Sequence, residues 1–212
     1  MTPLASTAAT RPTFGVPLAT RSFIARPANS GSGYTGIHVH FDGVPSHHLP
    51  LLLAAFQWRF ARDLHALTCD LIDAVAIGWD ELGTDLLDGA PHLVVQALTG
   101  GEHWPSRTLD VITPDGSPPV RMTVTEANAD ALDMHWGYIL HPHGIEVISL
   151  LHQDIGPVVD WNTDPRSVFS DDPARWQSDA PPPVTAPTLP TPPRTGSAAP
   201  ANHAGARRAL RR

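Results

Sequence analysis

The chain has 212 residues, of which 42% are hydrophobic, and this is enough for one folded domain with a sizeable core. The single cysteine, Cys69, excludes an intrachain disulfide and a cysteine-based zinc site, so we expect a reducing, cytoplasmic compartment. No stretch approaches the run of about eighteen apolar residues that a membrane-spanning helix needs, and we expect no membrane partner.

The charge is divided unevenly along the chain, which carries −7 in total. All fourteen basic residues are arginines, and the last six positions hold four of them: Arg207, Arg208, Arg211 and Arg212. The remaining chain has ten arginines against twenty-one acidic residues, a net charge of −11. An acidic domain repels phosphate, so we expect any nucleic-acid contact to be weak and to come from this C-terminal tip.

The first ordered elements follow a flexible leader over residues 1–20. Alternating apolar residues in 21–26 and 35–41 predict a β-hairpin with one buried face. A helix is expected from Pro50, because proline is tolerated in a first helical turn and apolar residues then recur at helical spacing. Those residues are Leu52, Phe56, Phe60, Leu64, Leu67 and Leu71.

Shorter elements fill the middle of the chain. Segments 79–89 and 91–100 are typical of short helices that end at glycine. A second hairpin is expected from 136–141 and 144–150, and 158–161 adds one more strand. The pattern predicts a single α+β domain over 21–170, with an antiparallel sheet of two hairpins and helices on one face.

The remaining residues, 171–212, form a disordered tail in this interpretation. Eight prolines lie between Ala180 and Ala201, among Ala, Thr and Ser. Such a composition cannot bury enough apolar area to offset the entropy of ordering.

Histidine is the residue type that stands out, with twelve copies that include the pairs His47–His48 and His141–His143. His38, His40 and Asp42 would project from one face of a strand and could converge on a metal ion, with His141 or His143 completing the shell. The competing interpretation is structural: Asp42-Gly43 before Pro45 is typical of a turn in which Gly43 takes positive φ. We favour this second interpretation and expect no metal and no cofactor.

A resemblance rests on the run Tyr34–Pro50 together with Trp136–Val147. These segments resemble a group of small uncharacterised proteins of phages and integrative or conjugative elements. The shared feature is a strand that ends in His, an aromatic residue, Asp, Gly, any residue and Pro, here His40 to Pro45. The resemblance implies a mobile-element setting and a role in replication or transfer control, such as that of a plasmid replication activator.

We therefore expect an accessory or regulatory protein, rather than an enzyme, that acts by binding another protein, or nucleic acid through the arginine-rich tip. Two alternatives stay open at this point. One is a metal-dependent hydrolase that uses His38, His40 and Asp42, and the other is a structural protein-interaction module.

Overall fold

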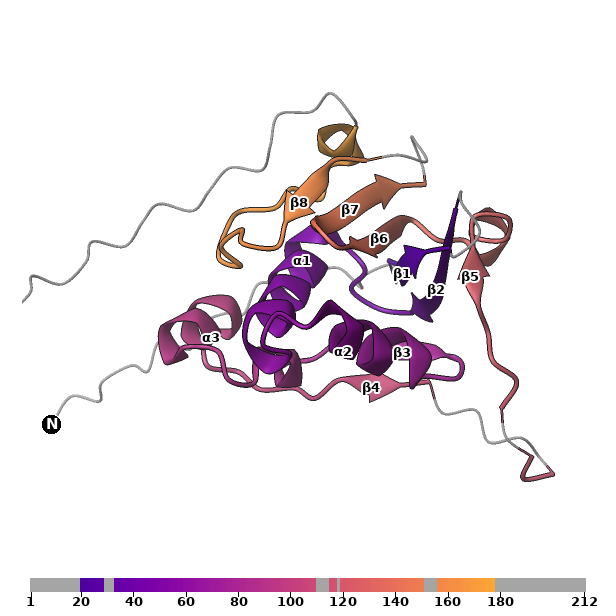
Figure 1. Ribbon diagram of the computed structural model, residues 1–212, viewed down its shortest axis with the longest axis horizontal. Coiled ribbons are helices and arrows are strands. Elements are labelled where there is room, and N and C mark those ends of the chain that lie inside the picture. The colour runs from indigo at the N-terminus through magenta and orange to yellow at the C-terminus, as the bar shows by residue number, and fades with distance from the viewer. Residues whose placement is uncertain (1–19, 29–32, 110–114, 118, 151–155, 178–212) are drawn as a thin grey trace, which may run out of the picture.

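A computed structural model describes residues 20–28, 33–109, 115–117, 119–150 and 156–177 (Figure 1). The strands are β1 (Ser22–Pro27), β2 (Tyr34–Val39), β3 (Gly78–Glu81), β4 (Arg107–Thr108), β5 (Val124–Thr125), β6 (Trp136–His141), β7 (Gly144–Ser149) and β8 (Val158–Asp160). The α-helices are α1 (Pro45–Ala54), α2 (Leu64–Thr68) and α3 (His92–Thr99). Two π-helical segments, η1 (Ala55–Arg59) and η2 (Cys69–Asp73), follow α1 and α2. Three 3₁₀ segments complete the described elements: η3 (Thr84–Leu87), η4 (Asp130–Leu132) and η5 (Pro173–Trp176).

The eight described strands form one sheet in the order β4-β3-β2-β1-β6-β7-β8, with β5 beside β2. Both predicted hairpins are present, since β1 pairs with β2 and β6 pairs with β7 in antiparallel register. The α+β class is confirmed, but the prediction of an antiparallel sheet was wrong. β1 runs parallel to β6, and β2 runs parallel to β3, so the sheet is mixed.

The parallel pairs arise because long connections return the chain to the same end of the sheet. Between β2 and β3 the chain passes through α1, η1, α2 and η2 before it re-enters beside β2. Parallel neighbours require such crossovers, whereas a tight turn suffices for antiparallel ones. Apolar alternation within a strand reports its buried face but not its direction.

The long helix expected from Pro50 begins earlier and is broken. Pro45 occupies the first turn of α1, and Pro50 lies inside the helix. After η1 the chain reverses through Ala61 and Arg62, whose φ angles of 48° and 67° are left-handed. Asp63 then caps α2 by accepting a hydrogen bond from Ala66 N at 3.0 Å.

The apolar stripe of this segment still faces the core despite the break. Leu52, Phe56, Leu67 and Leu71 are buried, and Phe60 and Leu64 pack against them. The prediction for 79–89 was wrong at its start, because Gly78–Glu81 is the strand β3 and only Thr84–Leu87 is helical. The helix expected in 91–100 is α3, and Gly100 ends it with a left-handed φ of 64°.

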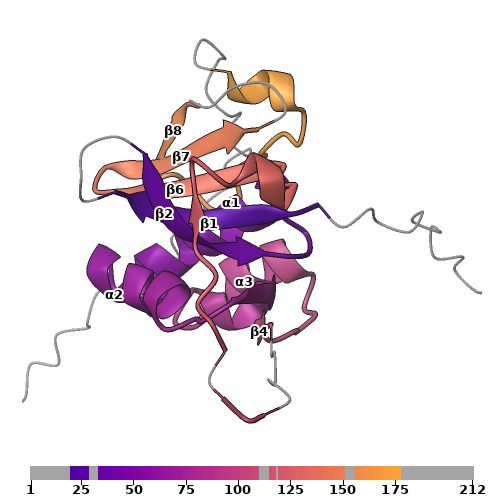
Figure 2. The same cartoon turned by 90° about the vertical axis from the view of Figure 1, so that its right-hand side faces the viewer.

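Both faces of the central strands are buried, which differs from the single buried face expected for the first hairpin. The main core joins Ile24, Ile37 and Val39 to the helices, and Figure 2 shows α2 and α3 on one side of β1 and β2. A smaller cluster on the opposite face contains Phe23, Ala25, Tyr34, Val124, Ala129, Met134, Ile139 and Ile148. The segment around β5 and η4 covers part of this second face.

The main core continues past the domain boundary expected at residue 170. Trp176 in η5 is buried in it, and its indole nitrogen donates to Ser170 O at 2.6 Å. The expected leader, 1–20, lies outside the described residues except for Thr20, as does the expected tail beyond Gln177.

Candidate functional site

His38, the first of the candidate metal ligands, is buried within the sheet. Its Cα lies opposite Phe23 of β1 and Gly78 of β3, and the residue is 7% exposed. Neither ring nitrogen has a hydrogen-bond partner. Burial, with smaller contributions from His40 and Arg21, lowers the pKa of His38 to about 4. The imidazole is therefore neutral at neutral pH.

Residues 40–42 form a turn beyond the end of β2. The backbone nitrogens of His40 and Phe41 donate to Trp79 O and Asp80 O, each at 2.9 Å. Asp42 is exposed and takes the left-handed φ of 54° that was expected for Gly43. Glycine is required at position 43 for another reason, because a Cβ there would lie 2.6 Å from Thr20 O and from Ser22 Cβ. The motif thus packs residues 20–22 against the start of α1.

His141 and His143 lie at the opposite end of the sheet from this turn. Ser22 is level with both Val39 and Trp136, so the end of β2 meets the start of β6. His141 is five residues further along β6, roughly 16 Å at about 3.3 Å per residue. There its Nε2 lies 2.7 Å from Glu146 Oε2. The structure therefore does not bring His141 or His143 to His38 and His40.

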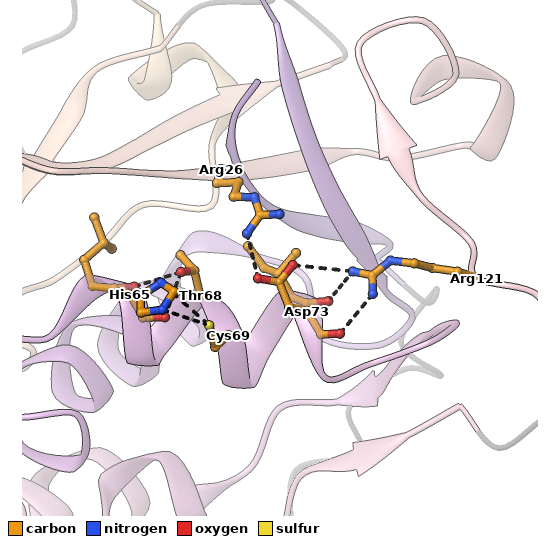
Figure 3. Close-up of polar contacts among 8 residues, drawn as sticks. Arg26, His65, Thr68, Cys69, Asp73 and Arg121 are labelled. Carbon is orange, nitrogen blue, oxygen red and sulfur yellow. Dashed lines mark hydrogen bonds and ion pairs between the residues drawn. The ribbon is translucent and has the colours of Figure 1, made fainter. Parts of the chain in front are cut away.

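No group of three or more His, Cys, Asp or Glu side chains in the described part of the chain is arranged to hold a metal ion. The closest pairing that involves the thiol is between Cys69 Sγ and the ring nitrogens of His65, at 3.6 and 3.7 Å on one face of α2 and η2 (Figure 3). Residues four apart on a helix meet in this way through their spacing alone.

A second buried histidine, His48, attaches α1 to the sheet. Its Nδ1 lies 3.3 Å from Ser22 Oγ, and its ring is perpendicular to that of Tyr138 at 5.1 Å. Complete burial, together with His47, lowers the pKa of His48 well below its usual range. Burial also raises the pKa of the Tyr138 hydroxyl, which donates to Gly43 O at 2.9 Å. This cluster is closed to solvent, and we assign it to packing.

A cavity of about 180 Å³ lies beside the neighbouring residue, His47. α1 contributes His47 and Leu51, the end of α3 contributes Leu98 and Thr99, and two loops contribute Trp104 and Ser167. The rings of His47 and Trp104 are nearly parallel, with an interplanar angle of 25° and centroids 6.3 Å apart. His47 Nε2 and Ser167 Oγ are buried and have no hydrogen-bond partner. We take this cavity as one candidate binding site in the described part of the chain.

Sequence reasoning did not single out this site. The His47–His48 pair belongs to the histidine-rich pattern, but nothing in the sequence connects His47 with Trp104 or Ser167. The four arginines predicted to contact nucleic acid, Arg207, Arg208, Arg211 and Arg212, lie outside the described residues.

Comparisons with known proteins give no assignment. No protein-family model matches the chain, and no curated protein or solved structure matches it significantly. Among the described residues, no helix has the length and apolar character needed to cross a bilayer.

Proposed function

We propose that this chain is an accessory or regulatory protein of a mobile genetic element, and that its folded domain binds a protein partner with a basic surface. The mobile-element setting comes from the resemblance carried by His40 to Pro45. We choose a protein partner over nucleic acid because most described arginines of the domain already form ion pairs within the chain.

Six arginines of the domain already form ion pairs with carboxylates of the same chain: Arg21, Arg26, Arg59, Arg107, Arg121 and Arg166. Figure 3 shows two of them converging on Asp73. Arg26 donates to the Asp73 carboxylate at 2.6 Å, and Arg121 donates to the backbone oxygens of Ile72 and Asp73 at 2.8 and 2.9 Å. These guanidinium groups stabilise the end of η2.

Two further arginines of the described chain have different surroundings. Arg62 donates to the Asn162 amide oxygen at 3.0 Å, and Arg175 is exposed in η5. Two exposed arginines without a carboxylate partner, Arg62 and Arg175, do not make the row of cationic groups that tracks a phosphate backbone. With ten arginines against twenty-one acidic residues before the tip, the field of the domain favours a basic partner.

The proposal is tested by comparing the DNA binding of three versions of the protein. The first is the unmodified chain, the second lacks residues 207–212, and the third carries glutamine in place of Arg207, Arg208, Arg211 and Arg212. Fluorescence anisotropy with a labelled duplex across a salt series gives affinity and salt slope. We expect weak binding by the unmodified chain, with a logarithmic slope no steeper than about −3.6, and loss of binding in both variants.

Unchanged DNA affinity in the two variants would place the nucleic-acid contact on the folded domain and contradict the proposal. The protein partner is tested separately, by binding to purified replication and transfer proteins encoded on the same element. We expect an interaction that weakens as salt rises, because it is made between an acidic and a basic surface.

A further inference from the structure

The cavity bounded by α1 and α3 has a largely apolar wall (Figure 1). Its aliphatic and proline residues are Pro50, Leu51, Ala97, Leu98 and Pro165. Leu93 lies one helical turn before Ala97 on the same face of α3, and it is 69% exposed. The apolar surface of the wall therefore continues onto the outside of α3. A cavity that adjoins exposed apolar side chains is typical of an interaction site.

Two exposed carboxylates border this cavity, and neither has a cationic partner among the described residues. Asp171 accepts hydrogen bonds from the backbone nitrogen and the hydroxyl of Ser46, which lines the cavity, at 2.8 and 2.7 Å. Glu102 lies in the loop from the end of α3 to Trp104, another residue of the wall. The arginine closest in sequence to the wall, Arg166, is already ion-paired. We call the cavity and these two carboxylates the α1–α3 site.

An apolar wall with a negatively charged border selects a ligand that is apolar at its centre and cationic around it. The chain itself contains such a segment, since Leu210 lies between two pairs of arginines in residues 207–212. The isobutyl side chain of leucine is smaller than benzene, which a cavity of about 150 Å³ holds in another protein. The volume of about 180 Å³ is therefore sufficient for it.

The chain is long enough for this segment to reach the α1–α3 site of the same molecule. The last described residue, Gln177, follows Asp171 by six residues, so their Cα atoms are at most about 22 Å apart. Residues 178–206 connect Gln177 to the arginine-rich segment and can span up to roughly 100 Å. A connection of this length gives a local concentration on the order of millimolar. A site with a millimolar dissociation constant is therefore substantially occupied.

We propose that the α1–α3 site binds residues 207–212 of the same chain. Leu210 enters the cavity and contacts its apolar wall. The arginines on either side of it pair with Asp171 and Glu102. This contact goes beyond the proposed function, because it gives the arginine-rich tip a binding site on its own domain. Its tests use only the chain and peptides of its sequence, so their outcome is separate from that of the DNA and partner experiments.

The first test compares amide chemical shifts of the ¹⁵N-labelled intact chain with those of a chain that lacks residues 207–212. We expect shift differences in residues 46–51, 97–104 and 165–171 that do not depend on protein concentration. Identical shifts in these segments would overturn the proposal. Differences that grow with protein concentration would assign the tip to a second copy of the chain and would overturn a contact within one chain.

The second test adds a synthetic peptide of residues 203–212 to the shortened chain. We expect saturable shifts in the same segments, with a dissociation constant on the order of 1 mM or below at low salt. Leu210→Ala in the peptide keeps all four arginines but removes the apolar anchor, so it should weaken binding about tenfold. Equal affinity of the two peptides would show binding by charge alone and would contradict insertion into the cavity.

Asp171→Asn tests the charged border from the side of the domain. Asparagine keeps an acceptor for Ser46 but removes the negative charge, so peptide binding should weaken about two- to fivefold. Asp130→Asn is the matched control, because Asp130 is an exposed carboxylate of η4, which covers the opposite face of the sheet. We expect this control to bind the peptide unchanged. Equal effects of the two variants would show unspecific attraction to an acidic domain and would refute the site.

Discussion

Replacement of Phe56 by alanine tests the central packing contact between the helices and the C-terminal half of the domain. Phe56 lies in η1, is 8% exposed, and stacks on Trp161 with ring centroids 4.2 Å apart and an interplanar angle of 25°. Loss of a buried phenyl ring costs about 3–5 kcal/mol, of which the ring–ring contact accounts for about 0.5–1.5 kcal/mol. Because domains of this size are stable by about 5–15 kcal/mol, the variant should fold but unfold at much lower urea.

Urea unfolding followed by far-ultraviolet circular dichroism gives the change in the free energy of unfolding. Leu93→Ala is the matched control, because Leu93 is 69% exposed on α3 and its truncation should change stability by less than about 0.5 kcal/mol. A loss below about 1 kcal/mol for Phe56→Ala, or a loss equal to that of Leu93→Ala, would show that the ring is not packed against Trp161.

Three further outcomes are expected. Ala61 has a left-handed φ of 48°, so Ala61→Gly should stabilise the domain by about 0.5–1 kcal/mol, as measured by urea unfolding. Ala66→Gly is the control: it lies inside α2, where glycine should destabilise the domain by a similar amount. The pKa of His38 falls from 6.5 to about 4 on folding, so the unfolded chain binds more protons between these values and stability should fall as pH drops through them. His38→Gln should keep the fold and flatten this pH dependence, although the part due to His48 remains. Elemental analysis of the purified chain should find no stoichiometric zinc, and one equivalent that is lost in His38→Gln would favour the hydrolase alternative instead.

The elements that the sequence predicted correctly are those defined by local pattern. Both hairpins and β8 lie where alternating apolar residues and turns placed them. Gly100 ended α3 as expected, because its φ of 64° is inexpensive only for glycine. The stripe that contains Leu52 and Leu71 faces the core, since helical spacing selects a face whether or not the helix is continuous.

The errors concern properties that no local pattern encodes. No glycine or proline lies in 60–63, so the reversal at Ala61 and Arg62 had no signal in the sequence. Pro50 was assigned to a first turn because an internal proline removes a backbone hydrogen bond, yet Pro45 holds that position and α1 accommodates Pro50 inside. Tertiary packing of the buried face of α1 outweighs this local cost.

The histidine pattern shows the same limit at the level of the site. Alternation in β2 correctly places His38 on one face of a strand, but whether His141 lies near it depends on the order and direction of strands between them. Because β1 is antiparallel to β2 and parallel to β6, these histidines lie at opposite ends of the sheet.

The cavity beside His47 depends on tertiary structure even more strongly. Its wall joins residues 46–51, 97–104 and 165–167, and each of these segments appears in the sequence as an ordinary helix or loop. Two polar atoms of residues that line it, His47 Nε2 and Ser167 Oγ, are unusual because they are buried without a hydrogen-bond partner. A missing hydrogen bond is a property of three-dimensional packing, so this site could be recognised only from the folded chain.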